Sequence, residues 1–126
     1  SGSMGYGFPA AISASLENPD RTVVCMAGDG CFQMTCNEMS TAMQHGAKPI
    51  VIVANNGRYG TIRMHQERHY PARPSGTDLA SPDFAALARA QASGTLAVIE
   101  LKLDPDMLTT GQSLAQVRAT ALAATS

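Results

Sequence analysis

Two nearly unbroken apolar runs, at residues 22–27 and 49–54, dominate the pattern of hydrophobic and polar positions along the chain. Continuous apolar runs of this length, bounded by turn residues, are typical of parallel strands that are buried on both faces. A third run, at residues 96–101, predicts another strand, which a turn at residues 104–106 follows. We therefore expect these segments to form a sheet.

Helices are predicted around and between the strands. The predicted helices are residues 10–17, a segment that begins at Thr35, a short helix within residues 58–82 and residues 83–90. Residues 113–124 are compatible with either a weakly amphipathic helix or a frayed end. Pro9 suits a first helical turn because it lacks an N–H group. Thr35 and Glu38 form the T-x-x-E pattern of a capping box, and Gly46 is a natural helix end. The glycine-rich residues 1–7 predict irregular structure.

Strand, helix and strand follow one another within about 35 residues, which is the arrangement of a βαβ unit. The strands of such a unit are parallel, and its crossover is right-handed. A chain of 126 residues has room for one domain. We therefore predict an α/β fold, a parallel sheet with flanking helices, in a single domain over residues 1–126.

Charge and hydropathy narrow the classes of function. Nine basic and ten acidic side chains give a formal net charge of -1, and no basic stripe is available to neutralise the phosphates of a nucleic acid. No apolar run approaches the roughly 20 residues that a transmembrane helix needs, and we see no signal peptide. We expect a soluble, cytoplasmic protein that binds neither nucleic acid nor a membrane.

Cysteine and histidine spacing does not predict a zinc site. Cys25, Cys31 and Cys36 follow a C-x5-C-x4-C pattern that matches no common zinc motif, and reduced thiols are the simpler interpretation. His65 and His69 have the spacing of two ligands on one helix face. Because no third ligand lies near them in the sequence, solvent-facing histidines are favoured.

Polar residues follow the first two predicted strands at the points where these strands end. Asp29 follows the first strand and Asn56 follows the second, and ligands of parallel sheets bind at the carboxyl ends of the strands. Their oxygens suit Mg²⁺, which needs further oxygen ligands from phosphate and water. Gly28 and Gly30 would let the backbone approach a phosphate. Taken alone, the GDG sequence favours an ordinary turn at a strand end.

Three segments together carry a family resemblance: GSMGYGFPAA at 2–11, GDGCF at 28–32 and NNGRYG at 55–60. They resemble the C-terminal, diphosphate-binding domain of thiamine diphosphate enzymes, in the acetolactate synthase and 2-oxo acid decarboxylase group. The resemblance extends from Gly2 to about Ala90 and resumes at about residues 94–105. It implies the thiamine diphosphate-binding fold, with thiamine diphosphate and Mg²⁺ as cofactors.

The resemblance also implies roles for individual residues. Asp29 and the side chain of Asn56 match two Mg²⁺ ligands, and the backbone carbonyl of Arg58 matches the third. Met4 matches the bulky residue beneath the bent cofactor, although a core or initiating methionine is the alternative. The other positions of the implied cofactor site are Gly2 near the pyrimidine, Gly28, Gly30, Cys31, Tyr59 and Gly60. Cys31 stands where the family has Ala or Ser, and we expect its similar size to be tolerated.

Two features of the family pattern are absent from this sequence. The family activates its cofactor with a glutamate on a separate pyrimidine-binding domain, and no glutamate of this chain has that context. We therefore assign no catalytic residue and expect a pyrimidine-binding domain on the same or a partner chain, in a homo-oligomer. Compared with the family pattern, about twenty residues of a βα unit are also missing after Ala90, through a deletion or an omitted stretch. We expect the exposed apolar edges of the shortened sheet to be covered by a partner chain or by the rest of the protein.

Three functions follow from these observations. The resemblance implies decarboxylation of a 2-oxo acid such as pyruvate, with transfer of the two-carbon unit to a second carbonyl. A cofactor-binding or assembly fragment without activity of its own is the alternative. A Mg²⁺-dependent phosphatase or nucleotide-binding domain ranks last, because it explains neither the Asn55-Asn56 pair nor the opening segment.

Overall fold

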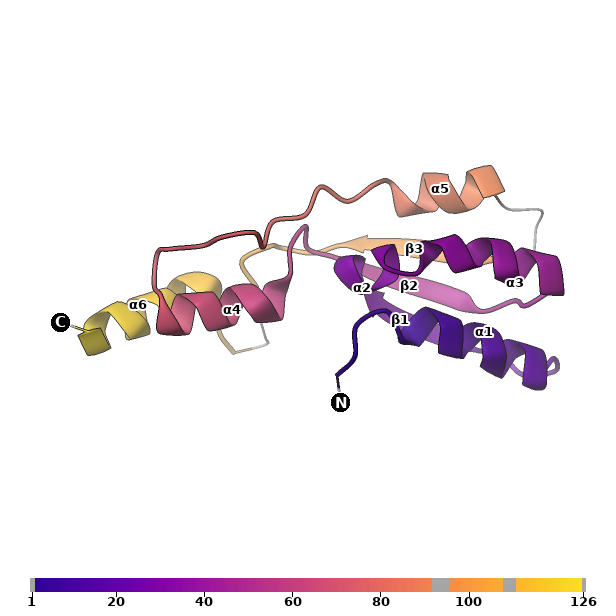
Figure 1. The fold of residues 1–126 in the computed structure, drawn as a ribbon, viewed down its shortest axis with the longest axis horizontal. Coiled ribbons are helices and arrows are strands. Elements are labelled where there is room, and N and C mark those ends of the chain that lie inside the picture. The colour runs from indigo at the N-terminus through magenta and orange to yellow at the C-terminus, as the bar shows by residue number, and fades with distance from the viewer. Residues whose placement is uncertain (1, 92–95, 108–110, 126) are drawn as a thin grey trace. The chain divides into compact units, whose positions relative to one another are not determined.

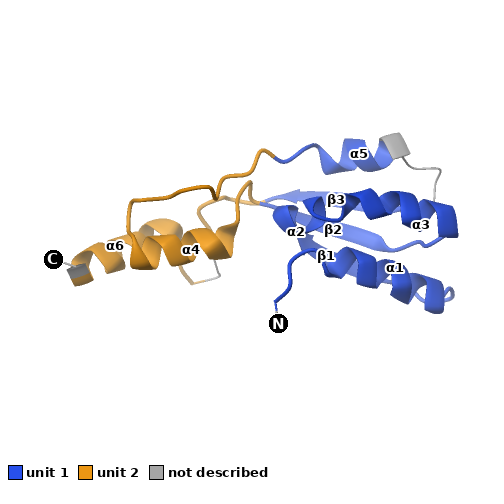
Figure 2. Ribbon diagram, in the orientation of Figure 1, with its two compact units in different colours: residues 1–55, 81–102 blue, residues 56–80, 103–126 orange. Residues whose placement is uncertain are grey.

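The computed structural model describes residues 2–91, 96–107 and 111–125 (Figure 1). These residues form two compact units (Figure 2). The first comprises residues 1–55 and 81–102, and the second comprises residues 56–80 and 103–126. The break that the sequence suggests after Ala90 adjoins residues 92–95, which lie outside the described residues.

The first unit contains a three-stranded parallel sheet in the order β1-β2-β3. Its elements are α1 (Gly7–Glu17), β1 (Val24–Gly28), α2 (Asp29–Gln33), the 3₁₀ turn η1 (Cys36–Glu38), α3 (Met39–His45), β2 (Ile50–Asn55), α5 (Phe84–Gln91) and β3 (Ala97–Lys102). The strands are in register, with Val24 beside Ile50 and Ile50 beside Ala97. The predicted α/β fold with a parallel sheet is confirmed.

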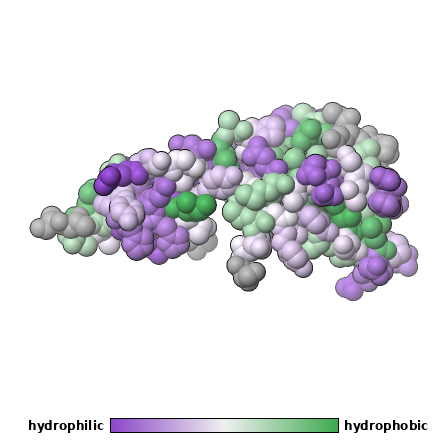
Figure 3. Space-filling view, in the orientation of Figure 1, coloured by the Kyte–Doolittle hydropathy of each residue, from purple (hydrophilic) through white to green (hydrophobic). Residues whose placement is uncertain are grey.

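One face of the sheet carries the core. Helices α1, α3 and α5 contribute buried side chains that pack with Val51 and Val53 of the central strand. The ring of Phe32 meets Phe8 and Phe84 edge to face, with centroids 5.1 and 5.5 Å away. On the face seen in Figure 3, hydrophilic and hydrophobic side chains are interspersed over the helical layer.

The other face of the sheet is apolar but uncovered in the part of the chain that the structure describes. Val24, Met26 and Ile99 are 54, 73 and 48% exposed. Register and alternation place nine residues on this bare face: Val24, Met26, Gly28, Ile50, Ile52, Ala54, Ala97, Ile99 and Leu101. The prediction that the first strand is buried on both faces is therefore wrong, because the described helices supply core residues to the opposite face only.

Two local predictions also need correction. Helix α1 begins at Gly7 rather than at Ala10. The predicted capping box is absent, because the Thr35 hydroxyl donates to the carbonyl of Gly5 at 3.2 Å instead of capping a helix. The Glu38 carboxylate accepts a hydrogen bond from Thr41. At the other end of α3, Gly46 has a φ of 72°, as a glycine helix end requires.

The second unit contains the helices α4 (Gly60–His69) and α6 (Leu114–Thr125). A long segment that follows α4 returns beside the start of that helix, where Arg58 and Asp78 form an antiparallel bridge. Leu114 and Val117 are the buried apolar residues of α6. The predicted helix with a following loop is confirmed, and of the two alternatives for residues 113–124 the structure shows the helix. No helix of the described residues has the length and apolar character needed to span a membrane.

The contrast between the two sheet faces makes a testable prediction. Phe32→Ala removes a fully buried ring and should lower the free energy of unfolding by about 3–5 kcal/mol. Met26→Ala, on the bare face, should lower it by less than about 1 kcal/mol. Urea unfolding of both variants, each made in this chain alone, measures these values. A Met26→Ala loss as large as that of Phe32→Ala would show that the face is covered in solution.

Candidate functional site

The carboxyl ends of β1 and β2 bring the first candidate residues to one edge of the sheet. Gly28 pairs with Ala54 in the strand register, so Asp29 and Asn55 each directly follow one member of this pair. Asp29 is only 3% exposed, and its Oδ2 accepts a hydrogen bond from the hydroxyl of Ser81 at 3.1 Å. A buried carboxylate therefore stands where ligands of parallel sheets bind.

Asp29 is also the first residue of α2, so the GDG sequence forms the entry to a short helix. The first N–H groups of a helix have no partner within the helix itself. Gly30 and Cys31 lie in this first turn. A Cβ atom added to Gly28 would meet no other atom within 4 Å. The backbone at Gly28 thus has open space beside it, as close approach of an anionic group requires, whereas Gly30 is buried.

The opening segment lies against the same part of the first unit. Gly5 has a φ of 78°, and a Cβ atom there would lie 3.4 Å from both Met34 and Thr35, just beyond α2. Met4 is 39% exposed, which excludes a core role for it within the described residues. Gly2 is also exposed. The structure therefore brings the opening segment into contact with the residues that follow the GDG helix.

The two consecutive asparagines have different environments. Asn55 is 5% exposed, and its side-chain amide donates to Oε1 of Glu100 at 2.5 Å. Burial opposes the charge of the Glu100 carboxylate, but hydrogen bonds from Lys102 and Asn55 outweigh it and lower the pKa of Glu100. The side chain of Asn55 thus links β2 to β3 through its hydrogen bond with Glu100. Sequence reasoning did not anticipate the Glu100 contact, because the two residues are 45 positions apart.

Asn56 begins a tight loop in the second unit. Its Oδ1 accepts a hydrogen bond from the backbone N–H of Arg58 at 3.2 Å. A Cβ atom on Gly60 would lie 3.1 Å from Nδ2 of Asn56, so a glycine permits the close approach of this amide. Gly57 has a φ of 66°, which side chains rarely tolerate. The local sequence therefore fixes the Asn56 side chain within its own loop.

A second segment holds the backbone of this loop. The N–H of Tyr59 donates to the carbonyl of Thr77 at 2.8 Å, and the N–H of Leu79 donates to the carbonyl of Gly57 at 2.7 Å. The loop containing Arg58 is thus paired on both sides of that residue. The sequence offered no signal for this pairing, because residues 77–79 have no strand pattern.

A buried ion-pair network lies beside the loop, within the second unit. Glu67 is fully buried, and its carboxylate accepts hydrogen bonds from Arg118 at 2.6 and 2.9 Å, from Arg63 at 3.1 Å and from the N–H of Ala72 at 2.9 Å. The bonds from Arg118 are the main cause that lowers the pKa of Glu67 to about 2, against the opposing effect of burial. Arg63 and Glu67 have the spacing of a helical pair, but Arg118 is too distant in sequence to be predicted.

The other polar candidates do not form a metal site in the described residues. These residues contain no group of three or more His, Cys, Asp or Glu side chains that could hold an ion. His65 and His69 are exposed and stacked, with ring centroids 6.4 Å apart, and the three cysteines form no disulfide. An ion at the Asp29 edge would therefore need amide, carbonyl or phosphate oxygens as additional ligands.

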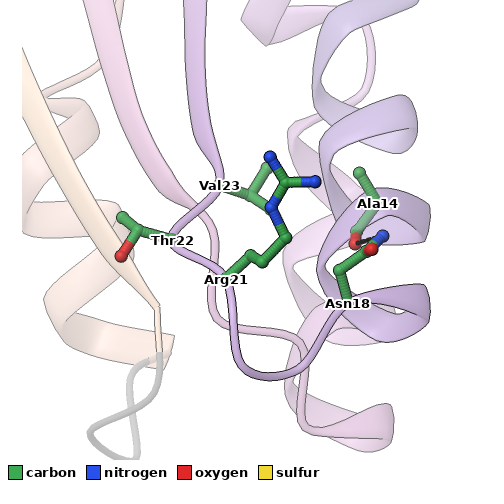
Figure 4. A pocket seen from close by; sticks show the side chains of 5 residues that line it. All are labelled: Ala14, Asn18, Arg21, Thr22 and Val23. Carbon is green, nitrogen blue, oxygen red and sulfur yellow. Dashed lines mark hydrogen bonds between the residues drawn. The ribbon is translucent and has the colours of Figure 1, made fainter.

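A shallow hollow of about 280 Å³ lies elsewhere in the first unit (Figure 4). Its lining residues are Ala14, Asn18, Arg21, Thr22 and Val23. They surround the connection between α1 and β1, so the hollow lies at the start of β1 and Asp29 follows the end of that strand. The hollow contains none of the candidate residues.

Comparison with known proteins identifies the family. The sequence profile of the thiamine pyrophosphate enzyme C-terminal TPP-binding domain matches residues 1–122. The chain belongs to this family. The family assignment agrees with the resemblance carried by residues 2–11, 28–32 and 55–60.

Curated members of the family include several acetolactate synthases. The acetolactate synthase large subunit of Haemophilus influenzae is 47% identical over 88 residues, which cover 69% of this chain and 15% of that protein. The mitochondrial acetolactate synthase catalytic subunit of Saccharomyces cerevisiae is 36% identical over 121 residues, or 92% of this chain and 18% of that protein. This TPP-binding chain thus spans less than a fifth of the length of these relatives.

The different environments of the two asparagines in this TPP-binding chain lead to a prediction. Asn55→Ala should lower the free energy of unfolding by about 1–2 kcal/mol and raise the pKa of Glu100, because that carboxylate loses a hydrogen bond. Asn56→Ala should lower the free energy of unfolding by less than about 1 kcal/mol. Urea unfolding and NMR titration of Glu100 test this contrast, and equal effects of the two variants would contradict it.

A second prediction concerns the pH dependence of stability. The pKa of Glu67 is lowered from 4.5 to about 2, so its stabilisation is complete above the unfolded pKa and is lost as the pH falls toward the folded pKa. A shift of this size corresponds to roughly 3 kcal/mol. Glu67→Gln should therefore show a smaller loss of stability than the wild type between neutral pH and about pH 3. If the free energies of unfolding of the wild type and of Glu67→Gln fall equally across this pH range, the assignment of this stabilisation to the Glu67 carboxylate is wrong.

Proposed function

We propose that this chain forms the Mg²⁺- and thiamine diphosphate-binding part of an acetolactate synthase-like enzyme. That enzyme would decarboxylate a 2-oxo acid such as pyruvate and transfer the two-carbon unit to a second carbonyl. The observation that carries the proposal is the pairing of Gly28 with Ala54, which places the buried Asp29 beside the strand end that leads directly into the Asn56 loop. The names of the relatives support the type of reaction.

The proposed donor set suits Mg²⁺. Asp29 offers a carboxylate, Asn56 a side-chain amide oxygen and Arg58 a backbone carbonyl, and all three are the hard oxygen ligands that Mg²⁺ prefers. The hydrogen bond from Ser81 restrains the Asp29 carboxylate. The hydrogen bond from the Arg58 N–H restrains the Asn56 oxygen. Three protein ligands leave coordination positions for diphosphate oxygens and water.

The first turn of α2 supplies the proposed contacts with the diphosphate. The N–H groups of Gly30 and Cys31 belong to this turn, and the open space at Gly28 would admit the phosphate groups. The remaining proposed cofactor contacts come from Gly2, Met4, Tyr59 and Gly60. When bound, thiamine diphosphate supplies the electron sink for decarboxylation, and the protein positions it.

The rest of the proposed enzyme would supply the activating glutamate. Glu67 is held by Arg63 and Arg118, and Glu100 is held by Asn55 and Lys102, so both carboxylates are engaged in structural contacts. A pyrimidine-binding domain, on the same chain or on a partner in a homo-oligomer, would provide the missing group. We also propose a cytoplasmic location.

The bare sheet face supports further protein around the first unit. Parallel sheets normally have helices on both faces, and the acetolactate synthases that this chain resembles are more than five times as long as the matched part. A second layer of amphipathic helices from the rest of the enzyme would cover Val24, Met26 and Ile99. We therefore propose that this face is an internal interface of the complete enzyme.

A cofactor-binding fragment without activity of its own is the second candidate function. The engagement of Glu67 and Glu100 in structural contacts favours it. Pyruvate consumption by this chain alone separates the two possibilities. Measurable turnover would contradict the inactive fragment, whereas turnover only after addition of a pyrimidine-binding domain would support the need for a partner.

Calorimetric titration with thiamine diphosphate and Mg²⁺ tests the proposed site in the assembled enzyme. Asp29→Ala and Asn56→Ala should each weaken binding at least about tenfold, because each removes an oxygen ligand. His65→Ala is the matched control, since His65 is exposed and has no proposed role. Unchanged binding by both alanine variants would show that the ligand assignment is wrong.

A further inference from the structure

Acidic side chains hold the Arg58 side chain, in addition to the backbone hydrogen bonds on either side of this residue. Its Nη1 lies 3.3 Å from Oδ1 of Asp106, and its Nε lies 3.9 Å from Oδ1 of Asp78. The side chain is 18% exposed, and its buried Nε has no hydrogen-bond partner. The orientation of this guanidinium therefore depends on the positions of the two carboxylates.

Asp78 connects Arg58 to the buried network. Nη1 of Arg63 lies 3.8 Å from the same Asp78 oxygen, and Nη2 of Arg63 lies 3.1 Å from Oε1 of Glu67. That oxygen also accepts the 2.6 Å hydrogen bond from Arg118 of α6. Charges of alternating sign thus form a charge chain within the second unit, in the order Asp106, Arg58, Asp78, Arg63, Glu67 and Arg118.

Burial differs strongly along the charge chain. The side chains of Asp78 and Asp106 are 75 and 67% exposed, and exposed ion pairs contribute little stability. The side chain of Glu67 is 1% exposed, and its hydrogen bonds to two arginines are protected from solvent. Glu67 is therefore the most firmly held residue of the charge chain, and Arg118 connects α6 to it.

Residues 77–79 contact both the Arg58 side chain and the backbone of the loop at residues 56–60. Thr77 and Leu79 form the hydrogen bonds with the backbone on either side of Arg58, and Asp78 between them contacts the Arg58 guanidinium. A displacement of Asp78 would therefore be transmitted to the carbonyl of Arg58 through two connected sets of contacts.

We propose that Arg118 is a positioning residue for the loop at residues 56–60, which carries proposed Mg²⁺ ligands. Through Arg118, α6 restrains this loop by way of Glu67, Arg63 and Asp78. The inference rests on the proposed function, because the relevance of the loop comes from its proposed Mg²⁺ ligands. Arg118 itself touches neither the loop nor the proposed ion. Its effect is the restraint of residues 56–60 in a single arrangement.

Amide hydrogen exchange measured by NMR tests this proposal without the cofactor. Arg118→Met should accelerate exchange at Tyr59 and Leu79 by about tenfold, if the restraint contributes about 1.4 kcal/mol. The Leu87 amide of the first unit, which donates to Asp83, should be unaffected. Arg118→Lys should restore part of the protection, because it keeps the charge but cannot form the bidentate contact. Unchanged exchange at Tyr59 and Leu79 in Arg118→Met would overturn the proposal.

Arg68→Met is the matched control. Arg68 is an exposed arginine on α4, and the ion pairs of the described residues do not include it. Exchange at Tyr59 and Leu79 should be unchanged in this variant. A general loss of stability would instead accelerate exchange at Leu87 together with the loop amides, and that result would assign Arg118 a merely structural role.

Calorimetry on the assembled enzyme distinguishes failure of this inference from failure of the proposed function. Arg118→Met should weaken Mg²⁺ and thiamine diphosphate binding by about three- to tenfold, and Arg118→Lys should recover part of the loss. If the wild-type enzyme binds no thiamine diphosphate, the proposed function fails even where the exchange effect is present. If the wild type binds and Arg118→Met binds equally well, the positioning role is wrong.

Discussion

The parallel pairing of β1 with β2 is the constraint on which the candidate site depends. Because Gly28 lies beside Ala54, two polar segments that are distant in sequence begin at adjacent strand ends. The same pairing fixes which side chains face the helices, so Val51 and Val53 enter the core. A slip of one residue would reverse the faces of β2 and would separate Asp29 from the segment that leads into Asn56.

Local sequence signals predicted most of the elements but not their contacts. The apolar runs predicted the three strands because their lengths and flanking turn residues are characteristic. The T-x-x-E pattern at Thr35 failed, since a tertiary hydrogen bond to Gly5 takes the hydroxyl that a cap would use. Burial of β1 was also mispredicted, because an apolar run does not reveal whether both faces are covered within the described chain.

The residues of the candidate site were predictable to different degrees. Asp29 and Asn56 follow strands, so their placement at strand ends could be inferred from pattern alone. The distinction between Asn55 and Asn56 required the structure, because it depends on Glu100 of β3. The network around Glu67 likewise depends on Arg118, which is 51 positions away. Membership of the thiamine pyrophosphate enzyme family supports thiamine diphosphate as the cofactor. It does not predict the contacts of Asn55 with Glu100 or of Glu67 with Arg118.

The proposed function requires Asp29 and the Asn56 loop to bind one divalent ion together with the diphosphate. Mn²⁺ accepts the same oxygen ligands as Mg²⁺ and broadens the NMR signals of nearby nuclei. Titration of the assembled enzyme with Mn²⁺ and thiamine diphosphate should broaden the amide signals of Gly30 and Arg58 together, at the same low metal concentration. Broadening of only one of these signals, or of neither while the cofactor is bound, would contradict the account.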